Sequence, residues 1–321
     1  MSTSLRTTHK AVAIGATAAL ALSLSACSGS SDSSEGGEDA ITIGFVNGSN
    51  TEFHTCLQAA IEEQAAEEGA EIITANSKQD PGTELANIED MLSRNVDLLM
   101  VQTVNVDALA NDIARAKAAD VPIFLTSVLP EDLSGVLGAQ IVPLAEVGKL
   151  DAEWVAEDAA GKPVEAAVIA GAPGAASDVL VGGFTDALPE NVEVVANQPG
   201  MFNRSKAQEV AENIISSHPD LGYAFVANED MAFGAANAFK AAGKDVKIVT
   251  SNGTDAGLEA LQNGTFSAIV SNSALITGHQ AVQHALDLLE DPRGSERIGK
   301  TPIELITKEN AADAPRYCAA E

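Results

Sequence analysis

The chain has 321 residues, of which 46 are acidic and 18 are basic, so its formal net charge at pH 7 is −28. Such an excess of negative charge disfavours nucleic acid and anionic membrane as partners, and it suits a soluble protein outside the cell. The roughly 280 residues from position 41 onward are enough for two domains with substantial cores.

The N-terminus has the pattern of an export signal. Arg6 and Lys10 precede an apolar run over 11–26 that ends in small residues, which predicts a signal peptide over 1–26. The run is shorter than the roughly 20 residues of a membrane-spanning helix. Leu24-Ser25-Ala26-Cys27 resembles the lipobox of bacterial lipoproteins, which implies cleavage before Cys27 and acylation of that residue. An ordinary secretory signal with an incidental cysteine is the alternative.

Residues 27–40 are rich in serine, glycine and acid and almost free of apolar side chains. Such a segment cannot bury a core, so a flexible tether is predicted. Without Arg6 and Lys10 the mature chain has 16 basic residues and a net charge of −30. The expected location is therefore outside the cytoplasm, with a lipid anchor on the outer face of the bacterial cell membrane.

Short apolar runs then alternate with amphipathic segments. The runs are continuous and rich in β-branched residues, as in strands buried on both faces of a parallel sheet. They occupy 41–46, 71–76, 97–103, 121–127, 164–171, 192–198, 223–228, 246–252 and 266–272. Helices are predicted over 57–69, 83–95 and 204–219, the second starting with Asp80 and Pro81 in positions that suit N-cap and N1. This alternation predicts an α/β fold with open, doubly wound parallel sheets.

Open sheets of this kind bind ligands beyond the carboxyl ends of their strands. The residues at those ends are mostly amides and hydroxyls, with few bases or nucleophiles; they are Asn47–His54, Asn76, Gln102, Thr103, Asn105, Ser127, Gly171–Asp178, Asn228–Asp230, Asn252–Asp255 and Asn272. Amides that offer both donor and acceptor groups suit a neutral, hydroxyl-rich ligand. The alternative is that the asparagines only favour turns.

Two cysteines remain after the signal and the tether, Cys56 and Cys318. In an oxidising compartment an isolated pair favours a disulfide over a metal site, although their separation in space is not fixed by the sequence. No metal is expected, since neither cysteine has metal-ligand spacing with a histidine. No nucleotide cofactor is expected either, because "GAPGAAS" (171–177) and "GFVNGSN" (44–50) lack the Walker and dinucleotide-binding patterns.

Several blocks in order resemble one family over nearly all of 41–308. They include "ANSKQDPGTELANIEDMLSRNVDLLMVQTVNVDAL", "AGAPGAASDVLVGGFTDAL" and "YAFVANEDMAFGAANAFKAAGKDVKIVTSNGTDAGLEALQNGTFSAIVSN". The family is that of the type I periplasmic sugar-binding proteins, the ribose-binding branch of ABC-transporter receptors. The resemblance implies two similar lobes, 41–140 with 273–300 and 141–272 with 301–308, joined by three crossings and followed by a tail over 309–321. It also implies a monomer that closes on its ligand, docks on a membrane permease and catalyses no reaction.

The resemblance places the ligand contacts at the strand ends. Phe53 and His54 match the first-loop aromatic pair, Thr51 a hydrogen-bonding position that is often Asn, and Phe202 a further ring. The amides Asn228, Asn252 and Asn272 match polar positions of the family. The family usually has Asp at the position of Asn252 and often has Gln at the position of Asn272. A ring against sugar C–H bonds with amides on its hydroxyls is a sensible sugar site.

The departures from the family concern its charged residues. Ser127 and Val128 stand where the sugar binders commonly have Asp-Arg, and Asp178 aligns with a second Arg. Arg supplies planar, charge-assisted donors, so its loss argues against assuming ribose, glucose or galactose. A polyol, a smaller or unusual sugar, or a ligand with a cation facing Asp178 or Glu229 remain alternatives.

The leading hypothesis is thus a lipid-anchored receptor that supplies a sugar or polyol to an ABC importer. The alternative is an extracellular sensor, or a protein that captures a signalling molecule, with no import role. An enzyme on this scaffold is disfavoured because the strand ends show no catalytic triad, metal cluster or paired acids. A repressor is disfavoured by the export signal and by the lack of a basic N-terminal helix-turn-helix.

Overall fold

The computed structural model of the chain describes residues 40–294 and 296–319. Cys27 and the rest of the predicted signal and tether lie outside these residues. The strands are β1 Thr42–Asn47, β2 Glu71–Asn76, β3 Leu98–Gln102, β4 Ile123–Ser127, β5 Gly138–Ile141, β6 Val164–Ala170, β7 Val192–Pro199, β8 Tyr223–Val226, β9 Lys247–Asn252, β10 Ala268–Ser271, β11 Ile298–Lys300 and β12 Glu304–Ile306.

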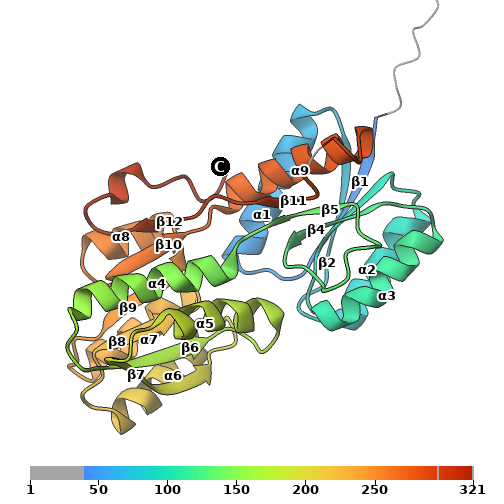
Figure 1. The fold of residues 1–321 in the computed structure, drawn as a ribbon. Helices are drawn as coiled ribbons and strands as arrows, with labels where there is room; N and C mark the ends of the chain where they lie inside the picture. The colour runs from blue at the N-terminus through green and yellow to red at the C-terminus, as the bar shows by residue number, and fades with distance from the viewer. Residues whose placement is uncertain (1–39, 295, 320–321) are drawn as a thin grey trace, which may run out of the picture. The chain divides into compact units, whose positions relative to one another are not determined.

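Helices separate most of these strands (Figure 1). They are α1 Glu52–Glu67, α2 Pro81–Ser93, α3 Val106–Ala118, α4 Leu144–Ala159, α5 Ala175–Ala187, α6 Arg204–Ser217, α7 Glu229–Ala241, α8 Asp255–Gln262 and α9 Ala274–Glu290, with a short 3₁₀ turn at Ala311–Asp313. Among the described residues, no helix combines the length and the apolar character that a membrane crossing requires.

The strands form two six-stranded sheets. The first has the order β11-β5-β4-β3-β1-β2 and is parallel throughout, and the second has the order β12-β10-β9-β8-β6-β7. The second sheet is parallel except at β12, which pairs antiparallel with β10 through Ile269↔Ile306. Each sheet with its helices is called a lobe below, the first built on β1 and the second on β6. These two parallel-sheet α/β lobes confirm the predicted fold class.

Helix pairs cover both faces of each sheet. In the first lobe α1 packs on α9 and α2 on α3, and in the second α4 packs on α5 and α6 on α7. The strands between them are buried on both faces, as the wholly buried β3 and β8 illustrate. This double burial explains why the sequence shows continuous apolar runs rather than alternation.

The chain passes between the sheets at three places. It crosses after β5 into α4, after β10 into α9, and between β11 and β12. A further segment, residues 307–319, follows β12. Within it Ala311 packs in the core of the second lobe and Tyr317 in the core of the first. This segment is called the C-terminal strap below.

Two features of the fold differ from the sequence prediction. Helix α1 begins at Glu52, five residues before the predicted start at 57, so that Phe53, His54 and Cys56 lie on its first turns. Strands β5, β11 and β12 were not predicted, because they have only four, three and three residues and no apolar run marks them. By contrast Asp80 caps α2 as predicted, its side chain accepting a hydrogen bond from the Thr83 amide.

Candidate functional site

A cleft lies at the carboxyl ends of both sheets. It has two adjoining parts of about 540 Å³ and about 420 Å³, which share lining residues from each lobe. The shared residues are Ser49, Thr51, Phe53, Gln79, Phe202, Asn228 and Asn252. A cleft at this position is what the open-sheet topology leads one to expect.

Two aromatic rings enter the cleft from opposite lobes. Phe53 comes from the first turn of α1, and Phe202 from the turn after β7. The backbone at Phe202 has φ +49°, and its ring lies directly over Gly171. A Cβ at Gly171 would stand 2.1 Å from the ring, so only glycine allows this close approach. The two half-buried rings give the cleft apolar surface on both sides.

His54 lines the cleft, but both of its ring nitrogens bind groups of its own lobe. Nε2 lies 3.0 Å from Oε1 of Gln102, and Nδ1 lies 2.7 Å from the hydroxyl of Thr51. Because an amide oxygen can only accept, Nε2 carries the proton and Nδ1 accepts from Thr51. Burial lowers the pKa of His54 to about 4. The neutral imidazole therefore links Thr51 to Gln102 through hydrogen bonds, and its plane is at right angles to the ring of Phe53.

Three asparagines from the ends of successive strands of the second lobe line the cleft. Oδ1 of Asn228 caps α7 by accepting from the Met231 amide at 3.0 Å, which leaves the side-chain NH₂ as the group it can offer a ligand. Oδ1 of Asn272 is buried and has no hydrogen-bond partner among the described residues. Asn252 has φ +145°, a conformation that L-residues rarely adopt. Asn228 thus keeps a donor group that its helix cap does not use, and Asn272 has a buried acceptor without a partner among the described residues.

Glu229 fixes the turn that follows Asn252. Its buried carboxylate accepts from the Gly253 amide at 2.8 Å, from the Thr254 amide at 3.1 Å and from the Thr254 hydroxyl. Burial raises the pKa of Glu229 to about 7, against the lowering effect of these hydrogen bonds. All of its strong contacts are internal to the second lobe, so Glu229 shapes the cleft wall more than it offers a free carboxylate.

Charged groups at the cleft are mostly acidic. The charged lining residues are Glu52, Lys78, Glu229 and Asp230, and no arginine is among the described residues that line it. Asp230 is paired with Arg204 at 2.9 Å. Burial, then the nearby Asp230 and Asp255, raise the pKa of Glu52. Within residues 40–294 and 296–319, no group of three His, Cys, Asp or Glu side chains is arranged to hold a metal ion.

Two sequence-predicted site residues stand apart from the others. Asp178 does not line the cleft, because its helix α5 turns Ala176, Ser177 and Leu180 toward the cavity and leaves Asp178 exposed. Ser127 is the last residue of β4, next to the lining residue Val128, and its side chain is not among those described. Thr51, Phe53, His54, Phe202, Asn228, Asn252 and Asn272 all line the cleft.

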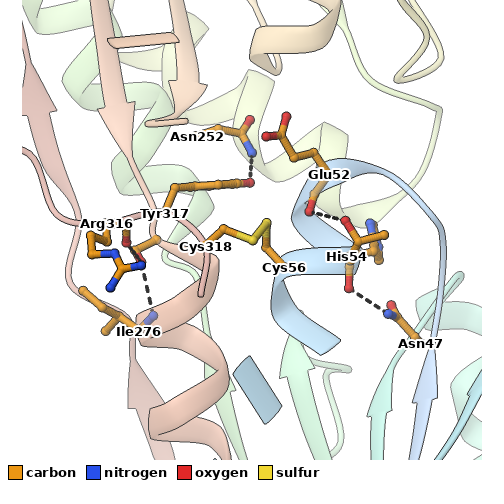
Figure 2. Close-up of a disulfide and its surroundings, with 11 residues drawn as sticks. Asn47, Glu52, His54, Cys56, Asn252, Ile276, Arg316, Tyr317 and Cys318 are labelled. Carbon is orange, nitrogen blue, oxygen red and sulfur yellow. Dashed lines mark hydrogen bonds between the residues drawn. A yellow bond between two sulfur atoms is a disulfide. The ribbon is translucent and has the colours of Figure 1, made fainter. Parts of the chain in front are cut away.

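Tyr317 and Cys318 of the C-terminal strap lie beside Asn252, which lines the cleft, and beside Cys56 of α1 (Figure 2). Cys318 is joined to Cys56 of α1 by a disulfide with a Cα–Cα distance of 5.0 Å, so the predicted bridge is present. The neighbouring Tyr317 is buried, and its hydroxyl receives a hydrogen bond from Nδ2 of Asn252. Burial raises the pKa of Tyr317 well above its usual value.

Several lining residues escaped the sequence prediction of the site. Gln79 and Met201 lie two or more residues beyond the ends of their strands, and both have positive φ. Gln102 ends β3, and its amide oxygen accepts from His54 and from the Gly48 amide. It is one of the strand-end residues named in the sequence analysis, and only its role as the partner of His54 was not predicted. Tyr317 lines neither part of the cleft but contacts the lining residue Asn252, and this contact had no sequence signal because only the three-dimensional path of the strap creates it.

The family model described as "Periplasmic binding protein domain" matches residues 43–293. The ribose import binding protein RbsB of Bacillus subtilis (strain 168) is 29% identical over 310 residues, covering 93% of this chain and 99% of that protein. The RbsB of Haemophilus influenzae is 30% identical over 280 residues, covering 85% of this chain and 92% of that protein.

Solved structures share the fold. An ABC transporter solute binding protein from Bacillus halodurans C-125, with bound myo-inositol, is 25% identical and has a TM-score of 0.80, covering 87% of this chain and 98% of that chain. The chain belongs to the periplasmic binding protein family. Its relatives are binding proteins, which confirms the expectation that it is not an enzyme.

Proposed function

We propose that this periplasmic binding protein is the receptor of an ABC importer and captures a small, neutral, hydroxylated ligand, a sugar or a polyol, between its lobes. The observation that carries the proposal is the pairing of Phe53 and Phe202 from opposite lobes with the amides of the second lobe. Ring faces match the C–H surface of such a ligand, and the amides match its hydroxyls. A relative named for ribose import and a solved structure with bound myo-inositol support the same ligand class.

The proposed contacts use the side-chain donors and acceptors of the lining residues that other hydrogen bonds do not occupy. Asn228 would donate to a ligand hydroxyl through its NH₂, since its oxygen already caps α7. Asn272 would accept through its unpartnered Oδ1. Thr51 and His54, each engaged by the other, would contribute contact surface and shape. Ser127 remains a candidate at the end of β4, and Asp178 is left out because it is exposed away from the cavity.

The remaining parts of the proposal concern the whole receptor. The lobes take the ranges 41–140 with 273–300 and 141–272 with 301–308, and they close on the ligand by a hinge motion at the three crossings. Cys27 carries the lipid anchor, which holds a monomer on the outer face of the cell membrane near its permease. Replacing Cys27 by Ala is expected to release the protein into the medium.

A thermal-shift screen against D-ribose, myo-inositol, other sugars and polyols, and small amines tests the ligand class. A ligand at 100 times its Kd should add about 2.7 kcal/mol to the free energy of unfolding. Phe53→Ala should abolish the shift because it removes one of the two rings. Phe233→Ala, a half-buried ring of the second lobe outside the cleft, is the matched control and should keep it.

Two results would contradict the proposal. Normal binding by Phe53→Ala would move the ligand out of this cleft, and turnover of a bound ligand would make the chain an enzyme. Import is tested separately by uptake of the labelled ligand in cells with and without the gene. Unchanged uptake in the deletion strain, with binding intact in the purified protein, would favour the sensor alternative.

A further inference from the structure

The C-terminal strap contacts three segments that each carry a cleft residue. Cys318 is bonded to Cys56, one helical turn after Phe53 on α1. The carbonyl of Tyr317 accepts from the Leu275 amide at 2.9 Å, and that of Arg316 accepts from the Ser273 hydroxyl, at the start of α9 directly after Asn272. The hydroxyl of Tyr317 meets the amide of Asn252 at the end of β9. The strap therefore joins cleft segments of both lobes outside the three crossings.

Asn252 is the residue that most needs such support. It lines both parts of the cleft and has φ +145°, and a strained conformation of this kind persists only where its surroundings hold it. Its backbone carbonyl accepts a hydrogen bond from the backbone amide of Asn272 at 3.1 Å. The carboxylate of Glu229 accepts from the backbone amides of the next two residues, Gly253 and Thr254. Among the described residues, its side chain hydrogen-bonds to the hydroxyl of Tyr317.

We propose that Tyr317 is a positioning residue of the binding site. Its hydroxyl accepts a hydrogen bond from Nδ2 of Asn252 and so fixes the orientation of that side-chain amide. Oδ1 of Asn252 is then turned toward the cleft, where it accepts from a ligand hydroxyl. The Cys56–Cys318 disulfide keeps Tyr317 in place. In Figure 2 the amide nitrogen of Asn252 faces the Tyr317 oxygen, and the amide oxygen points away from it. The ligand role of Asn252 rests on the function proposed above.

Tyr317→Phe is the decisive variant, because it removes the hydroxyl and keeps the ring that packs in the core of the first lobe. The affinity for whichever of D-ribose or myo-inositol the wild type binds should fall about fivefold, which corresponds to one ordinary net hydrogen bond. Tyr223→Phe is the matched control, since the hydroxyl of Tyr223 binds Asp158 at 2.5 Å and lines neither part of the cleft. It should leave the affinity unchanged.

The disulfide provides a second arm. The double variant Cys56→Ala, Cys318→Ala should lose affinity to a similar extent, and adding Tyr317→Phe to it should cost little more, because residues that act as one unit are not additive. A purely structural strap would instead lower the melting temperature and leave the affinity of the folded protein unaltered. Additive losses, or an unchanged affinity in Tyr317→Phe, would overturn the proposal.

A third arm needs no ligand. The side-chain NH₂ signals of Asn252, assigned through Asn252→Asp, should shift in the NMR spectrum of Tyr317→Phe and of the reduced protein, and stay in place in Tyr223→Phe. Unchanged signals in Tyr317→Phe would overturn the proposal even if no probe binds. If the wild type binds none of the probes while the signals shift, the proposed function fails and the positioning of Asn252 by Tyr317 stands.

Discussion

Asn228 serves two purposes in the second lobe. Its oxygen caps α7, and its nitrogen is the group left for the cleft. Asn252 shows the same division, since its nitrogen is bound by Tyr317. In His54 both ring nitrogens are bound within the first lobe, so neither is left for a ligand. At the scale of residues, internal hydrogen bonds thus use some of the polar groups at the cleft and leave the remaining ones for a ligand.

Asn228→Asp separates these two purposes. The carboxylate can still accept from the Met231 amide, so the stability of α7 should be kept, while the donor toward the ligand is lost. We expect ligand affinity to fall by roughly tenfold or more, as for a hydrogen bond to a partner left unpaired. Isothermal titration with the ligand found in the screen measures this.

Asn203→Asp is its matched control. Asn203 caps α6 by accepting from the Lys206 amide at 2.9 Å, and its exposed side chain is not part of the cleft lining. This variant should bind as the wild type does. Equal affinity in both variants would show that the nitrogen of Asn228 makes no contact with the ligand.

At the scale of elements, a buried acid anchors the loop between β3 and α3. Glu84 on α2 accepts from the Thr103 hydroxyl at 2.7 Å and from the Val104 amide at 2.6 Å, and both of these residues line the cleft. Asp112 on α3 is also buried and faces Glu84. Burial raises the pKa of Glu84 to about 7 and that of Asp112 to about 6.

This pair gives the protein a specific pH dependence. Between about pH 4.5 and 7 the folded protein binds more protons at Glu84 than the unfolded chain does, so this contribution to stability is full below that range and is lost as pH rises through it. Glu84→Gln should therefore flatten the fall in the free energy of unfolding between pH 5 and 8. His54, with its lowered pKa, acts in the opposite direction in both proteins.

Urea denaturation at a series of pH values measures the effect. Glu89→Gln is the control, because Glu89 is exposed on the same helix. An identical pH slope in Glu84→Gln and the wild type would mean that Glu84 is ionised throughout this range.

The sequence allowed most elements to be predicted and fewer of the contacts. Buried parallel strands such as β3 and β8 have continuous apolar sequences, and the N-cap residue Asp80 marks the start of α2. Both signals can be predicted because they depend only on neighbouring residues in the sequence. Strands β11 and β12 have three residues each and pair with strands more than 30 residues away along the chain, so they carry no local signal.

The same reason separates the predicted site residues from the missed ones. Asn228, Asn252 and Asn272 follow strands directly, so topology alone takes them to the cleft. The orientation of Asp178 depends on the rotation of α5, which a strand-end rule does not give. The contact of Tyr317 with Asn252 joins residues 65 positions apart along the chain and requires the whole path of the strap.

At the scale of the whole molecule, the Cys56–Cys318 disulfide closes a loop across a sequence separation of 262. A bridge over so long a segment restricts the unfolded chain strongly, and its removal should lower the free energy of unfolding by about 2 to 5 kcal/mol. Urea denaturation with and without reductant measures this. In the double variant Cys56→Ala, Cys318→Ala, the reductant should leave the free energy of unfolding unchanged. Equal stability of the wild type with and without reductant would contradict the prediction.

The same bridge gives the folded body the topology of a covalent ring. Every strand and helix from β2 to β12, together with most of α1, lies between the two joined cysteines. A protease that cuts one surface loop within this range therefore leaves a single covalent molecule, with both halves of the cleft still attached to each other. Such a nicked protein would migrate as one species in a non-reducing gel and separate into two fragments only after reduction.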